Sequence, residues 1–226
     1  MEDEYTAAGA FIGEEKPERS GPVGRLVDYL AGAVTIIFHP VFLPLYGLYL
    51  LFNIPALLVF LPGQVRKVIF LMVLVNNVIL PLLLLPIFKL RGIITSYDLE
   101  NRSERIIPLM TASLMYFVTA IMIYRFQLPG MVKAFLFSSA CVVLATALLN
   151  FRWKVSVHAV GVGAMVAAVL VLSFRMYAGM PGIVAIVFIV SGLVLSSRLW
   201  LRAHTPEQIY TGFLAGFTIM GLGMMI

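Results

Sequence analysis

The sequence contains very few charged side chains: Asp, Glu, Lys and Arg make up 12% of its 226 residues, while 61% are hydrophobic. A soluble domain carries about 25% charged residues. The deficit excludes an ordinary soluble domain and predicts a polytopic membrane protein. Basic runs interleaved with exposed aromatic residues are also lacking, so we expect no nucleic-acid partner.

Cysteine is nearly absent as well. The single Cys141 lies in an apolar run, which excludes an internal disulfide and predicts a small buried hydrophobic residue. Residues 1–24 are acidic and contain no apolar core, so we expect a mobile tail rather than a signal peptide. Residues 25–226 are then predicted to form a single transmembrane domain.

Long apolar runs dominate this domain. A helical span needs about 20 apolar residues, and seven segments meet this requirement, at residues 26–52, 66–88, 106–125, 132–149, 156–175, 182–200 and 206–226. His39-Pro40 and Pro44 interrupt the first segment, which is therefore either one kinked span or a hairpin within the membrane. The predicted fold class is all-α, a polytopic transmembrane helical bundle of six or seven spans.

The alternation of successive spans determines which loops share a membrane face. Loops 89–105, 150–155 and 201–205 are expected on one face, whichever path the first segment takes. With the adjoining span ends, this face collects Arg102, Arg105, Arg152, Lys154, His158, Arg198, Arg202 and His204. The opposite face carries five basic residues but no acidic residue and no histidine. We therefore predict that the chemistry of the chain is concentrated at one water–lipid boundary.

Two of the three histidines, His158 and His204, stand at span ends, where ionisable groups suggest function. Pro206 suits the first position of the last helix, so His204 is expected near a helix N-terminus that favours a bound anion. Arg198 can bind a phosphate through two hydrogen bonds. Imidazoles and a guanidinium at one boundary predict metal-free phosphoryl transfer through a histidine.

These residues resemble the motifs of the type 2 phosphatidic acid phosphatase superfamily. Its third motif, Ser-Arg-x5-His-x3-Asp with a glycine four residues further on, corresponds to Ser197, Arg198, His204, Gln208 and Gly212. Its second motif, Pro-Ser-Gly-His, corresponds to Ser156 and His158, with Val157 in place of glycine. Its first motif, Lys-x6-Arg-Pro, is reduced to Arg105 and Pro108, with Arg102 one turn earlier. The resemblance covers roughly residues 90–216.

The resemblance implies catalysis through a phosphohistidine. His204 would attack phosphorus, and His158 would protonate the leaving oxygen and later activate water. The substrate phosphate would be bound by Arg198, Arg105, Arg102, Ser156 and Ser197, while Gln208 would orient His204 in place of the usual Asp. No metal ion or other cofactor is implied. Because His158 must be protonated while His204 is neutral, activity should have a bell-shaped dependence on pH.

The implied function is an integral-membrane phosphatase that hydrolyses a lipid phosphate or diphosphate, such as polyprenyl diphosphate or phosphatidic acid. Two alternatives remain open: a lipid phosphotransferase using the same site, and a non-catalytic lipid-binding or scaffold relative, which Gln208 favours. Bacterial members of the family usually act on the outer side of the cytoplasmic membrane, so we expect an inner-membrane protein with an extracytoplasmic site. Its expected partners are the substrate and membrane lipids. The excess of basic residues on the active face favours the opposite orientation.

Structural roles compete with this interpretation. The two histidines could satisfy nearby loop carbonyls, and basic residues at span ends could contact lipid headgroups. Asp98, Glu100 and Glu104 could form an acidic metal site, but a solvated loop paired with nearby Arg is the simpler interpretation, since no imidazole has ligand spacing to them. His39, beside Pro40, is expected to be a packing or kink residue.

Overall fold

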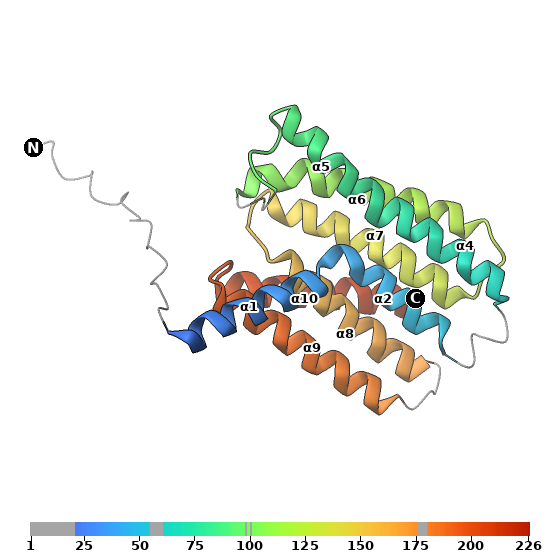
Figure 1. Cartoon of the computed structure of the whole chain (residues 1–226). Helices are drawn as coiled ribbons and strands as arrows, with labels where there is room; N and C mark the ends of the chain where they lie inside the picture. Colours follow the sequence, from blue (N-terminus) through green and yellow to red (C-terminus); the bar gives the residue numbers. More distant parts are fainter. Residues whose placement is uncertain (1–20, 55–60, 98, 100, 176–179) are drawn as a thin grey trace, which may run out of the picture.

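The computed structural model describes residues 21–54, 61–97, 99, 101–175 and 180–226, and all regular structure in these ranges is helical (Figure 1). In chain order the helices are α1 (Pro22–Ile37), η1 (Pro40–Phe42), α2 (Leu43–Phe52), α4 (Gly63–Val73), η2 (Leu74–Ile79), α5 (Leu80–Leu90), α6 (Arg102–Tyr124), α7 (Gly130–Asn150), α8 (Val157–Arg175), α9 (Pro181–Trp200) and α10 (Pro206–Met225). Of these, η1 is a 3₁₀ turn and η2 is a π-helical turn that joins α4 to α5.

Seven helical segments in the described part of the chain are long and apolar enough to cross a membrane: Pro22–Phe52, Gly63–Leu90, Arg102–Tyr124, Gly130–Asn150, Val157–Arg175, Pro181–Trp200 and Pro206–Met225. The predicted all-α transmembrane bundle is confirmed, and the chain is an integral membrane protein. One boundary was wrong: residues 22–24, assigned to the N-terminal tail, form the first turn of α1 because Pro22 suits the first helical position. Of the rest of the predicted tail, Gly21 caps α1, and residues 1–20 lie outside the described residues.

The first span is kinked and does not fold back as a hairpin. Helices α1 and α2 follow one another in the same general direction, with η1 between them (Figure 1). Pro40 has no N–H and cannot continue α1, and Nδ1 of His39 accepts a hydrogen bond of 3.3 Å from the backbone N–H of Val41. The hydroxyl of Tyr46 donates to the carbonyl of Ile37 at 2.8 Å, which satisfies a carbonyl at the end of α1.

Helices α8 and α10 cross with their backbones in contact. A Cβ at Gly212 of α10 would crowd the carbonyl of Ser156, just before α8, and one at Gly216 would crowd the carbonyl of Val160 in α8. A Cβ at Gly163 of α8 would crowd the carbonyl of Phe213 in α10. Glycines four residues apart on one helix thus allow the close approach of the other helix. Beside this crossing, the backbone N–H of Ser156 donates to the carbonyl of Gln208 at 3.3 Å. The start of α8 is therefore held against the first turn of α10.

The connections α5–α6, α7–α8 and α9–α10 all lie at one end of the bundle, on the left in Figure 1. Hydrogen bonds join two of them, because Arg105 at the start of α6 reaches the carbonyls of both Leu99 and Val155. The alternation of spans inferred from the sequence therefore places these loops together, as predicted.

Candidate functional site

A cavity of about 240 Å³ opens near this end of the bundle. Its basic wall residues come from separate parts of the chain, namely His39, Arg105, His158, Arg198 and His204, and Asn77, Tyr97 and Tyr116 add further polar groups. The basic residues are supplied by the kink of the first span, α6, the first turn of α8, the last turn of α9 and the α9–α10 connection. Four of them were predicted from sequence to share a site, and His39 was not.

His204 is held in one orientation by the first turn of α10. Its side chain is only 8% exposed, and Nδ1 lies 2.8 Å from Oε1 of Gln208. An amide oxygen can only accept, so Nδ1 carries the hydrogen and Nε2 keeps its lone pair. Gln208 thus occupies the orienting position predicted for it. Residue Glu207, one position earlier, is exposed.

The surroundings of His204 keep its imidazole neutral. Burial lowers the pKa of His204 to about 4, and the hydrogen bond to Gln208 opposes this shift. The positive charges of Arg105, Arg198 and Lys154 lower the pKa of His204 further. At neutral pH the ring therefore has an unprotonated nitrogen, which nucleophilic attack requires.

Arg198 presents a buried donor that is not engaged. Within the described part of the chain, its Nε is buried and makes no hydrogen bond. A buried guanidinium N–H without a partner is costly, so it marks a place where an anionic ligand would be favourable. The preceding Ser197 is turned away, since its hydroxyl donates to the carbonyl of Leu193 in the same helix at 2.8 Å.

The two other predicted arginines differ in position. Arg105 is 9% exposed and lines the cavity, and it donates through Nε to the carbonyl of Leu99 at 2.6 Å and through Nη1 to that of Val155 at 3.4 Å. Arg102 is exposed, and its Nη1 donates to the carbonyl of Arg152 at 2.7 Å. Arg105 therefore belongs to the cavity wall, while Arg102 braces the α7–α8 connection.

His158 is buried at the start of α8, with 8% of its side chain exposed. Its Nε2 lies 3.2 Å from the carbonyl oxygen of Thr35 in α1 and carries the hydrogen of that bond. Its partner is a main-chain carbonyl, the contact expected of a structural histidine, but the ring also lines the cavity. Ser156 is fully buried, and its hydroxyl accepts from the backbone N–H of Ala159 at 3.4 Å, so it caps α8.

His39 lies at the kink as expected, but the sequence interpretation did not predict that it also lines the cavity. Its ring meets that of His158 edge to face, with centroids 5.2 Å apart and planes at 86°. It is exposed rather than packed, and it lines the same cavity. An ionisable side chain within a span, next to a helix-breaking proline, was the available signal.

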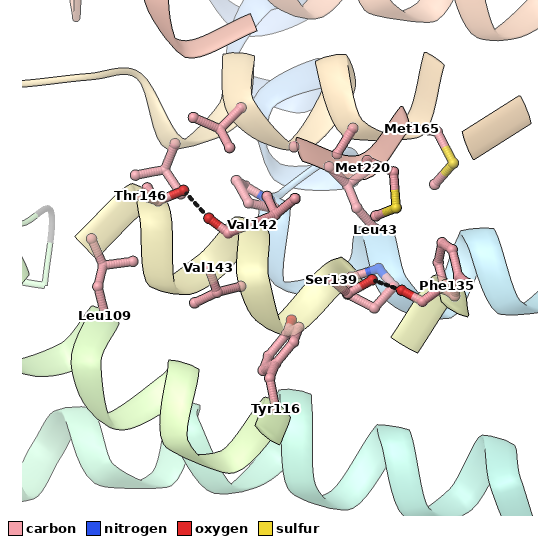
Figure 2. Close-up of a pocket in the computed structure, with 16 residues that line it drawn as sticks. Leu43, Leu109, Tyr116, Phe135, Ser139, Val142, Val143, Thr146, Met165 and Met220 are labelled. Carbon is pink, nitrogen blue, oxygen red and sulfur yellow. Dashed lines mark hydrogen bonds between the residues drawn. The ribbon is translucent and has the colours of Figure 1, made fainter. Parts of the chain in front are cut away.

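A second, apolar cavity of about 70 Å³ adjoins the first. The two share the wall residues Pro40, Leu109, Tyr116, Val143 and Val157. Figure 2 shows side chains of the second cavity on both sides of α7: Tyr116 of α6 on one side, and Leu43, Met165 and Met220 of α2, α8 and α10 on the other. The hydroxyls of Ser139 and Thr146 donate to carbonyls of α7 itself at 2.8 and 2.7 Å, so they do not add free polar groups to the lining. The polar cavity thus continues into a hydrocarbon-like one.

The acidic loop has a local structural role. Asp98 and Glu100 lie outside the described residues. The carboxylate of Glu104 accepts from the backbone N–H of Thr95 at 2.8 Å and from Nδ2 of Asn101 at 2.7 Å, rather than pairing with an arginine as expected. Among the described residues, no group of three His, Cys, Asp or Glu side chains could hold a metal ion.

Comparison of the chain with models of known families, with curated proteins and with solved structures finds no match.

Proposed function

We propose that the chain is a lipid phosphatase that acts through a phosphohistidine at His204. The observation that carries the proposal is a neutral imidazole, oriented by Gln208, that shares one cavity with the unengaged Nε of Arg198. A nucleophile and a phosphate-binding guanidinium are the minimum that the reaction needs. Arg105, in the same wall, adds a second positive charge.

In the first step, Nε2 of His204 attacks phosphorus and the bond from phosphorus to the lipid-side oxygen breaks. His158, protonated on both ring nitrogens, gives the proton on Nδ1 to that oxygen, while its Nε2–H stays bonded to the carbonyl of Thr35. The oxygen leaves as the lipid alcohol or, from a diphosphate, as the lipid monophosphate. In the second step, water attacks the phosphohistidine, its proton passes to Nδ1 of His158, and inorganic phosphate is released with His204 regenerated. Arg198 and Arg105 stabilise the negative charge on the phosphoryl oxygens in both steps.

A lipid substrate is favoured by the apolar cavity beside the polar one. A phosphate held at Arg198 would have its organic group directed along the walls that both cavities share, past Val143 and Tyr116. A site at the end of the spans also suits a lipid that moves laterally within the bilayer. We propose the cytoplasmic membrane as its location, with the site on the extracytoplasmic face.

Incubation of the purified protein with radiolabelled polyprenyl diphosphate and with phosphatidic acid tests the proposal. Release of inorganic phosphate, together with an acid-labile and base-stable label on the protein, is the expected result. Transfer of the label to added alcohols would identify a phosphotransferase. Binding without release would favour the non-catalytic alternative, for which the neutral side chain of Gln208 is the supporting observation.

Replacing Gln208 with Asp should move the acid limb of the kcat/KM profile to higher pH. In the wild type, kcat/KM should fall as the pH drops through the pKa of His204, about 4, because the protonated ring cannot attack. A carboxylate at position 208 stabilises the imidazolium and should raise that pKa by about 1–3 units. Gln127→Asp, an exposed site beyond the other end of the bundle, is the control. An unmoved acid limb in Gln208→Asp would contradict the assignment of the limb to His204.

Filling the shared wall should impair long-chain substrates selectively. Val143→Phe is expected to lower kcat/KM for a long-chain lipid phosphate by about tenfold, since the larger side chain would occupy the space proposed for the lipid chain. The decrease should be smaller for a short-chain phosphate ester. Leu148→Phe, on the exposed side of the same helix, is the matched control. Equal losses on long and short substrates would argue against a chain-binding role for this cavity.

A further inference from the structure

The kink of the first span brings a third imidazole to the site. We propose that Nε2–H of His39 donates a hydrogen bond to the bound phosphate, a role that rests on the proposed function of the cavity. His39 is far from the other cavity residues in sequence, since α2, α4, η2 and α5 separate it from Arg105 in α6. Its ring nevertheless lies edge to face with that of His158, with the ring centroids 5.2 Å apart. Both rings line the cavity that contains Arg198 and His204.

The hydrogen bond at the kink determines which ring nitrogen faces a ligand as a donor. Nδ1 of His39 accepts from the backbone N–H of Val41 at 3.3 Å, so Nδ1 uses its lone pair and the hydrogen of the neutral ring is on Nε2. The kink thereby orients the imidazole and selects the tautomer at the same time. Nε2 is the nitrogen further from the backbone, which suits contact with a ligand in the cavity.

The residues that line the cavity differ from those expected to bind phosphate. Arg102, Ser156 and Ser197 do not line it, and Arg102 and Ser197 donate to the carbonyls of Arg152 and Leu193. His39 would therefore add a neutral donor beside the guanidinium groups of Arg198 and Arg105. His39 is exposed to the cavity rather than buried in packing, so its ring is accessible to such an oxygen.

Two substitutions separate this role from a purely structural one. His39→Asn keeps an acceptor near the position of Nδ1, which preserves the kink, but removes the distal donor. His39→Gln places an amide N–H near the position of Nε2 but removes the kink acceptor. A donor role predicts that His39→Gln is the milder change, whereas a structural role predicts that His39→Asn is.

The experiment measures the Kd for inorganic phosphate and kcat/KM for a lipid phosphate in both variants and in the wild type. Loss of a hydrogen bond to a charged group should weaken phosphate binding and lower kcat/KM by about 10- to 100-fold in His39→Asn. His39→Gln should stay much closer to the wild type. If His39→Asn does not fold, His39→Gln compared with His39→Met, which has equal length and no donor, makes the same distinction.

The outcomes are distinct for each proposal. Wild-type behaviour in His39→Asn with a defect in His39→Gln would overturn the donor role and leave the phosphatase proposal intact. Phosphate binding that depends on the donor at position 39, without any turnover in the wild type, would support the role of His39 and overturn the phosphatase. A wild-type protein that neither binds phosphate nor turns over a lipid phosphate would overturn both.

Discussion

The His204→Ala variant is expected to lose phosphate release by at least about 10⁴-fold, because the substitution removes the atom proposed to bond to phosphorus. Nδ1 of His204 is engaged by Gln208 at 2.8 Å, which leaves Nε2 for the attack. Steady-state phosphate release from the best lipid substrate gives the rate. Radiolabel trapped on the same samples should disappear from the variant.

Tyr210→Phe is a suitable control for this experiment, since Tyr210 is 65% exposed on the same helix and its ring is retained. It should behave as the wild type. Undiminished turnover in His204→Ala would exclude His204 as the nucleophile. A protein that binds phosphate but shows no turnover before or after the substitution would instead be the non-catalytic relative.

The Arg198→Ala variant is expected to lower kcat/KM by about 10²- to 10³-fold, the usual effect of removing one preorganised donor to a developing oxyanion. The buried Nε of Arg198 makes no hydrogen bond to the described residues, so a bound phosphate would supply its missing partner. Arg198→Lys should recover only part of this loss, because an ammonium keeps the charge but not the paired donors of a guanidinium.

Arg202 provides a matched control, because it is an exposed arginine in the connection that follows α9. Arg202→Ala and Arg202→Lys should leave kcat/KM close to the wild-type value. Competition by inorganic phosphate measures ground-state binding in all four variants. Equal, small effects at positions 198 and 202 would indicate that both arginines merely contribute to a general positive charge.

The transmembrane bundle was predictable because each of its helices is determined by the local sequence. Each span needs only a long apolar run and a polar interruption, and the alternation of spans then places the loops. That reasoning also predicted that Arg105, His158, Arg198 and His204 would meet at one end of the bundle, and they line a single cavity. Their catalytic roles remain predictions.

Other details of the site depend on hydrogen bonds that the chain forms only when folded. Ser156, Ser197 and Arg102 have the right chemistry for phosphate binding, but a nearby backbone group engages each of them. Local sequence does not show which carbonyl or N–H a flexible side chain will meet. The same applies to His39, since its proximity to His158 depends on the direction in which a proline kink redirects the first span.

The contact of α8 with α10 has a consequence for how this site can change in evolution. Gly163, Gly212 and Gly216 let two backbones touch, so the spacing between the histidines at positions 158 and 204 is set without any intervening side chain. A single added methyl group at one of these glycines would push the two helices apart and separate the rings with them. Substitutions at these three glycines should therefore disturb the site, although none of the three lines either cavity.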